Sequence, residues 1–115
     1  MAQYTVRDAL EELNELRNKL QSSVTDLLSR REVEKVAYLL FSLENEMAEI
    51  EKEARRLRLK GELDVGVYRT LVKGYHELTG MIIEESARHG VERDVRNYYT
   101  FLRAEHALNI KSHEK

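Results

Sequence analysis

Residues 33–57 have the sequence VEKVAYLLFSLENEMAEIEKEARRL, in which apolar side chains recur at alternating intervals of three and four residues. This is the heptad spacing of a helix that packs lengthwise against another helix, because both intervals return the chain to the same helical face. The pattern predicts a long helix at the centre of an all-α protein. Its apolar positions are Val33, Val36, Leu40, Leu43, Met47, Ile50, Ala54 and Leu57.

The composition of the whole chain also favours helices. Its 115 residues include no proline, a residue that removes a backbone donor and clashes with the preceding helical turn. Hydrophobic residues make up 42% of the chain, and charged residues make up 35%, against about 25% in an average globular protein. The length predicts one helical domain, which we place at residues 1–110, followed by a frayed tail at residues 111–115.

The starts of the first two helices are predicted from capping residues. Thr5, with Asp8 three residues later, can cap a first helix. Ser29, with Glu32 three residues later, has the spacing of a capping box, which predicts a tight corner near residues 28–30 and a second helix from about residue 30 to 60.

Later boundaries come from glycine and aspartate. Gly61 and Gly90 suit left-handed C-caps, and Asp64 suits the N-cap of a third helix. A fourth helix then starts near Val91 and fades around Asn109. Because the connections are short, we expect an antiparallel helical bundle of about four helices, built on a long hairpin of the first two.

A candidate interface lies beside the heptad seam. Residues 36–43 are apolar on all sides of the helix, because Tyr38, Leu39 and Phe41 fall outside the heptad positions. A helix that is apolar all round is buried all round. In a small elongated domain, a subunit interface provides that cover more readily than the domain's own core. We therefore expect a homo-oligomer with Tyr38, Leu39 and Phe41 in a protein interface.

Two basic clusters support an alternative function, nucleic-acid binding. One cluster ends the second predicted helix, where cations also suit the helix dipole. The other interleaves arginine with aromatic residues around Tyr98 and Phe101, a combination that can neutralise phosphates and stack bases. The net charge of −2 falls well short of that of a dedicated nucleic-acid binder. The candidate residues are Arg55, Arg56, Arg58, Lys60, Arg93, Arg96, Tyr99 and Arg103.

Catalytic and metal-binding functions are disfavoured. The chain has no cysteine, which excludes thiol catalysis and thiolate metal sites. A di-iron bundle site requires Glu-x-x-His motifs, and none of the four histidines has a glutamate three residues before it. Glu85 and His89 share a helical face, but they form a single pair near a helix end. We therefore expect no enzyme activity, no cofactor and no metal.

Two glycines, Gly74 and Gly80, fall inside the third predicted helix. Each costs about 1 kcal/mol relative to alanine in a helix interior. Close approach of a neighbouring helix is the favoured reason for them, with a kink or a ligand cleft beside Tyr75 and His76 as alternatives.

The predicted function is association. No stretch approaches the roughly 18 apolar residues of a membrane-spanning helix, and residues 1–10 lack the apolar region of a signal peptide, so we expect a cytoplasmic protein with no membrane partner. We predict a non-enzymatic helical module for protein–protein interaction and oligomerisation. It would act as a small structural or adaptor subunit of a larger assembly, with a protein partner that the sequence does not identify. The alternative is an accessory nucleic-acid-binding subunit.

Overall fold

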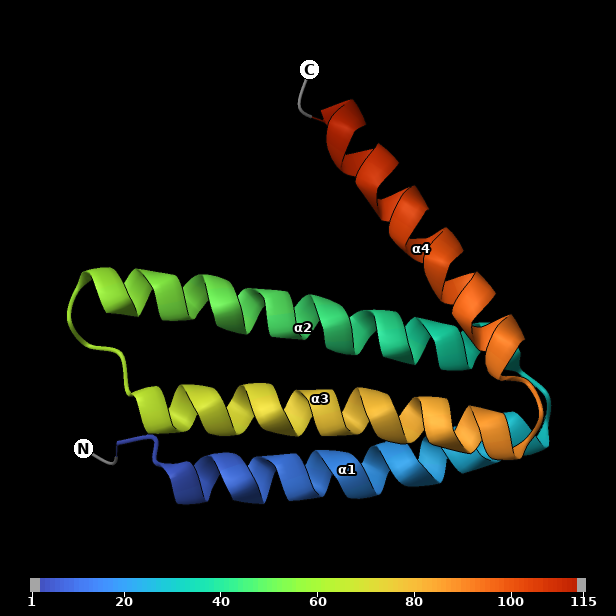
Figure 1. Ribbon diagram of the computed structural model, residues 1–115, viewed down its shortest axis with the longest axis horizontal. Coiled ribbons are helices and arrows are strands. Elements are labelled where there is room, and N and C mark those ends of the chain that lie inside the picture. Colours follow the sequence, from blue (N-terminus) through green and yellow to red (C-terminus); the bar gives the residue numbers. More distant parts are fainter. Residues whose placement is uncertain (1–2, 114–115) are drawn as a thin grey trace.

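The computed structural model describes residues 3–113, with side chains described as far as Asn109. Within this part of the chain, helices joined by short turns are the only regular secondary structure. Four helices pack against one another (Figure 1), which confirms the predicted all-α class and the number of helices. They are α1 (Val6–Ser29), α2 (Val33–Leu59), α3 (Val65–Arg88) and α4 (Glu92–His113).

Local capping explains most of the helix boundaries. The Thr5 hydroxyl accepts a hydrogen bond from the Asp8 amide, and the Asp8 carboxylate accepts one from the Thr5 amide, so the predicted capping box is confirmed. Asp64 caps α3 by accepting from the Val67 amide. Gly61 and Gly90 have φ values of 71° and 72°, in the left-handed region expected of the residue that follows a helix end.

The corner between α1 and α2 differs from the prediction. The Ser29 hydroxyl donates to the Thr25 carbonyl oxygen, so Ser29 completes α1 instead of capping α2. Arg31 then turns the chain with a φ of 57°, and α2 begins at Val33. Glu32 makes no side-chain cap and instead accepts a hydrogen bond from Lys35. The predicted capping box from Ser29 to Glu32 is therefore wrong.

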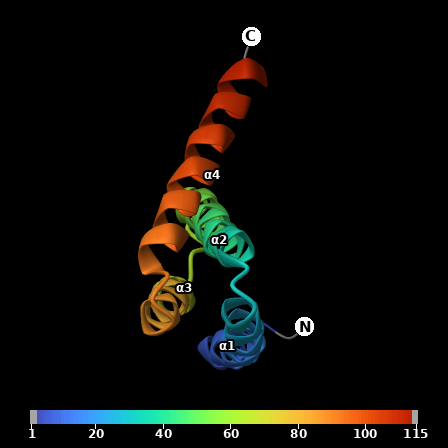
Figure 2. The same cartoon turned by 90° about the vertical axis from the view of Figure 1, so that its right-hand side faces the viewer.

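The first three helices are antiparallel from one to the next, with α1 and α3 running in one direction and α2 in the other (Figure 1). The view in Figure 2 shows them in a triangular arrangement, with α3 packed against both α1 and α2. The most extensive helix–helix contact joins α1 to α3, while α2 packs mainly against α4 and α3. The sequence pattern predicts a spine made of the first two helices. In the structure, α1 and α2 share only a minor contact, because α3 takes most of the inner face of α1.

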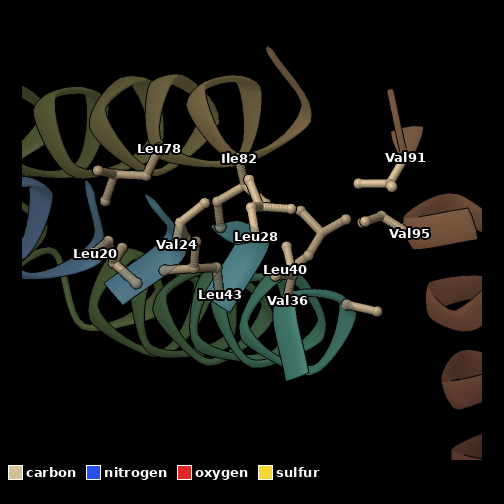
Figure 3. Close-up of a cluster of buried hydrophobic side chains, with 11 residues drawn as sticks. Leu20, Val24, Leu28, Val36, Leu40, Leu43, Leu78, Ile82, Val91 and Val95 are labelled. Atoms are coloured by element: carbon tan, nitrogen blue, oxygen red, sulfur yellow. The ribbon is translucent and has the colours of Figure 1, made fainter. Parts of the chain in front are cut away.

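The hydrophobic core sits at one end of the molecule, where the end of α1, the start of α2, the end of α3 and the start of α4 meet (Figure 3). Helix α2 contributes the first half of its heptad ladder to this core. The buried side chains are Leu20, Val24, Leu28, Val36, Ala37, Leu40, Leu43, Leu78, Ile82, Val91 and Val95. Ser86 is also fully buried, and its hydroxyl donates to the Ile82 carbonyl oxygen.

The two helical glycines have different surroundings. A Cβ atom on Gly74 would overlap the side chain of Leu13, so Gly74 allows α1 to approach α3 closely, as the sequence predicts. A Cβ atom on Gly80 would meet nothing within 4 Å. Close helix packing therefore accounts for Gly74 and not for Gly80.

Helix α4 leaves the bundle instead of lying along it. It starts beside the beginning of α2 and projects away from the other three helices (Figures 1 and 2). The helix continues to His113, so the first three residues of the segment predicted to fray are helical, and residues 114–115 lie outside the described part. The molecule is consequently broad and flat, with principal extents of 45 × 41 × 19 Å.

Candidate interaction surfaces

Helix α4 is attached to the first half of α2. Val91 and Val95 anchor its start in the core. Further along, the ring of His106 meets the ring of Phe41 edge to face, with centroids 5.5 Å apart. A hydrogen bond to the Glu34 carboxylate raises the pKa of Tyr98. These contacts fix α4 across residues 33–41 of α2 and leave the second half of α2 without this cover.

The three residues predicted to form an interface do not share one surface. Tyr38 is 59% exposed and lies beside Phe41, with ring centroids 6.5 Å apart. Phe41 is half-buried because His106 of the same chain covers part of it. Leu39 is half-buried and packs against the core cluster. The structure thus brings Tyr38 and Phe41 together next to α4 and places Leu39 among core side chains.

A row of exposed apolar side chains follows one side of α4. Phe101 is 64% exposed and Leu108 is 66% exposed, and Tyr98, three residues before Phe101, is also exposed. Spacings of three and seven residues keep them close to one helical face. We call these residues, Tyr98, Phe101 and Leu108, the α4 stripe.

The opposite end of the bundle carries an apolar groove, which we call the end groove. It lies where α2 ends and α3 begins and encloses about 750 Å³. Ile50, Ala54 and Leu57, from the second half of the heptad ladder, line it on α2. Its other apolar and aromatic lining residues are Tyr4, Leu63, Val67, Tyr68 and Leu71. Charged residues of both signs surround them: Glu49, Lys52, Glu53, Arg56, Glu62 and Asp64.

Two tyrosines brace the helices near the end groove. The Tyr4 hydroxyl, at the groove margin, donates to Glu12 over 2.6 Å, and the Tyr75 hydroxyl donates to Glu46 over 3.0 Å. Burial, with the hydrogen bond to the neighbouring glutamate, raises the pKa of each tyrosine to about 12. The second bond ties α3 to α2 at the middle of the bundle.

Exposed large hydrophobic side chains are concentrated on these two surfaces. Among the described residues, all of them except Tyr38 lie either on α4 or around the end of the bundle that carries the end groove. At that end, Tyr4 lines the groove, and Val6, Leu10, Leu59 and Val65 lie outside its lining. Leu59 is 89% exposed. Contiguous exposed apolar surface of this kind typically marks an interaction site.

The two basic clusters are far apart. The cluster from Arg55 to Lys60 ends α2, whereas Arg93 and Arg96 begin α4 beside the start of α2 (Figure 1). The 27 residues of α2 separate these positions by about 40 Å. Several members also have partners within the chain.

Those partners are acidic or aromatic. Arg56 forms an ion pair with Glu53, whose carboxylate raises the pKa of Arg56. Arg96 pairs with Glu92. The Arg103 guanidinium lies 5.8 Å from the centroid of the Tyr99 ring. Arg55, Arg58, Lys60 and Arg93 are exposed.

The described residues contain no group of three or more His, Cys, Asp or Glu side chains arranged to hold a metal ion. Glu85, half of the pair considered from the sequence, forms an ion pair with Arg88 instead. None of the helices, as far as they are described, is long and apolar enough to cross a membrane.

Comparison with known proteins gives no family match, no similar curated protein and no similar solved structure. The function must therefore be argued from this chain alone. Sequence reasoning drew attention to Phe101 but missed Leu108 and the end groove. The seven-residue interval between Phe101 and Leu108, which places both side chains on one face of a helix, could have predicted the α4 stripe from the sequence.

Proposed function

We propose that this protein is a non-enzymatic helical module that self-associates and serves as a structural or adaptor subunit of a larger assembly. The observation that carries this proposal is the amount of exposed surface. The chain exposes 8516 Å². A compact monomer of 13.5 kDa is expected to expose about 6,500 Å². The excess is about 2,000 Å² per chain.

That excess has the size of a stable subunit interface. Standard interfaces bury about 800 Å² on each partner, and obligate homodimers bury about 1,000 Å² or more on each partner. The radius of gyration supports the same conclusion, because it is 16.2 Å, against about 13 Å for a compact chain of this length. Self-association would bring both values back towards those of a compact protein.

The distribution of apolar side chains also favours this role. The α4 stripe and the end groove are separate apolar surfaces on one chain, and Tyr38 adds a further exposed aromatic ring beside α4. Two such surfaces allow copies of the chain to associate, and the exposed Tyr38 ring leaves aromatic surface that a different protein can contact. We keep Tyr38 and Phe41 within the proposed interface region, since they border α4, and we assign Leu39 a supporting position beneath it.

The mass of the protein in solution tests this proposal directly. Size-exclusion chromatography with light scattering, over a wide concentration range, should give at least twice the 13.5 kDa chain mass. A mass of one chain at every concentration would refute self-association. Tyr38→Glu should weaken the oligomer without unfolding it, because Tyr38 is exposed. Glu15→Gln, at an exposed position of α1 outside both the end groove and α4, serves as a surface control.

Nucleic-acid binding receives less support as the alternative function. The basic clusters are separated by the length of α2, and Arg56, Arg96 and Arg103 have partners within the chain. Gel-shift titration with single- and double-stranded DNA and RNA tests it, since binding through phosphates weakens steeply with salt. Binding at low salt that is lost in an Arg93→Gln/Arg96→Gln variant would favour the alternative.

A further inference from the structure

We propose that the end groove of one copy receives helix α4 of a second copy, with Phe101 and Leu108 as the side chains that enter it. This inference rests on the proposed self-association and names the surfaces that perform it. It also accounts for the concentration of exposed large hydrophobic side chains on α4 and around the end groove. The α4 stripe provides projecting apolar side chains, and the end groove provides an apolar hollow that can receive them.

The dimensions of the two surfaces match. Phe101 and Leu108 are seven residues apart, which is about 10 Å along a helix. On α2, Ile50 and Leu57 are also seven residues apart and line the end groove over the same length. A helix lying in the groove could therefore place one anchor near each end of the apolar lining. This is the helix-in-groove mode of recognition, in which anchors recur at helical spacing.

The chain's own α4 does not occupy the groove. It is held against the start of α2 by Val91, Val95 and the contact between His106 and Phe41. Phe41 precedes Leu57 by 16 residues, or about 24 Å of helix. Tyr98 faces Glu34 of its own α2, whereas Phe101 and Leu108 remain 64% and 66% exposed. Helix α4 can therefore bind its own chain and still offer Phe101 and Leu108 to a second copy.

The binding is expected to be mainly apolar. The apolar lining of the groove is aliphatic apart from Tyr4 and Tyr68, while the surrounding charges are of both signs and include the ion pair between Arg56 and Glu53. Charges at a rim contribute little to affinity compared with buried anchors. Phe101 and Leu108 should therefore dominate the dissociation constant.

Replacing both anchors tests this inference. Phe101→Glu/Leu108→Glu should raise the dissociation constant of the oligomer by at least about 100-fold, since each anchor side chain is expected to act as a hot spot. Both residues are exposed, so the helical circular dichroism signal should be unchanged. The matched control is Thr100→Glu/Ala107→Glu on another side of α4, which should leave the dissociation constant within about threefold of the wild type.

Disulfide cross-linking tests directly whether α4 of one copy lies in the end groove of another. Because the chain has no cysteine, Leu57→Cys and Leu108→Cys can be introduced into separate copies, mixed and mildly oxidised. A covalent dimer is expected from this mixture, and little from a mixture in which Ala107→Cys replaces Leu108→Cys. In a chain carrying both Leu57→Cys and Leu108→Cys, an intramolecular bond would show that α4 folds back onto its own groove and would overturn the inference.

The outcomes distinguish failure of self-association from failure of the proposed contact between α4 and the end groove. A monomeric wild type refutes self-association and, with it, the binding of α4 in the end groove of a second copy. If the wild type is oligomeric, the contact between α4 and the end groove is refuted by either of two results. The Phe101→Glu/Leu108→Glu variant keeps the wild-type oligomer mass, or the mixture of Leu57→Cys and Leu108→Cys copies gives no covalent dimer. Self-association would then still hold.

Discussion

Replacing Gly74 with alanine tests the packing of α1 on α3, with Gly80 as an internal control. Alanine stabilises a helix interior by about 1 kcal/mol relative to glycine. At Gly80 a new Cβ atom meets nothing within 4 Å. Gly80→Ala should therefore raise the free energy of unfolding by about 1 kcal/mol, and the melting temperature by about 4 °C.

Gly74→Ala should have the opposite effect. Its new Cβ atom overlaps both terminal carbons of Leu13, and forcing a packed side chain out of place costs about 1–3 kcal/mol. After the helix gain of about 1 kcal/mol is subtracted, the variant should lose about 1 kcal/mol of stability. The two glycine variants should thus differ by about 2 kcal/mol.

Urea denaturation followed by far-ultraviolet circular dichroism measures this difference, at one fixed protein concentration because association contributes to stability. Adding Leu13→Ala to Gly74→Ala removes the overlap and leaves only the helix gain, so the double-mutant cycle should show a favourable coupling of about 2 kcal/mol. If Gly74→Ala stabilises the protein as much as Gly80→Ala does, α1 does not approach α3 closely at Leu13 and the reasoning is wrong.

Three further outcomes are expected. Leu43→Ala, in the core, should lower the free energy of unfolding by about 3 kcal/mol in the same denaturation assay, whereas Leu59→Ala should change it by less than about 0.5 kcal/mol because Leu59 is 89% exposed. Thr5→Ala should cost about 1 kcal/mol by thermal unfolding, through loss of the α1 cap. The pKa of Tyr75 is raised from 10.0 to about 12, so the folded state holds this proton more tightly; the resulting stability is complete below pH 10.0 and is lost as the pH rises to about 12. Thermal unfolding across that range should show a smaller loss in Tyr75→Phe, and an equal loss in both proteins would contradict the assignment.

The helices themselves could be predicted from the sequence because their signals are local. Thr5 with Asp8, Asp64, Gly61 and Gly90 act on backbone groups within one turn of their own position. Ser29 misled the prediction because a serine hydroxyl can either accept a bond from the next helix or donate one to the preceding turn. The structure uses the second arrangement, with the Thr25 carbonyl oxygen as acceptor.

The arrangement of the helices could not be predicted in the same way. The apolar positions of α4, such as Val95 and Leu102, show that one face is covered but not by which helix. Leu39 falls outside the heptad seam, yet it packs against the core because α2 has neighbours on more than one side. A single helical pattern defines a face, whereas the partner of that face depends on the other helices.

The continuous heptad ladder illustrates this limit and also explains the end groove. Val36, Leu40 and Leu43 are buried in the core cluster, whereas Ile50, Ala54 and Leu57 continue the same pattern into the end groove, which none of the described helices fills. The ladder therefore extends beyond its intramolecular partners. Phe101 and Leu108 of the α4 stripe form a second apolar row that stays largely exposed.

These two surfaces favour a closed dimer over an open chain of copies. If the α4 of each copy lies in the groove of the other, the dimer contains two contacts between α4 and an end groove. The loss of translational and rotational freedom, about 4–15 kcal/mol, is incurred only once for both contacts. In an open linear assembly, each added copy incurs that loss and gains only one contact between α4 and an end groove. Reciprocal exchange is therefore favoured wherever the geometry permits it, as in other linked binding events. The mass of the wild-type oligomer should accordingly reach a plateau at two chains instead of growing with concentration.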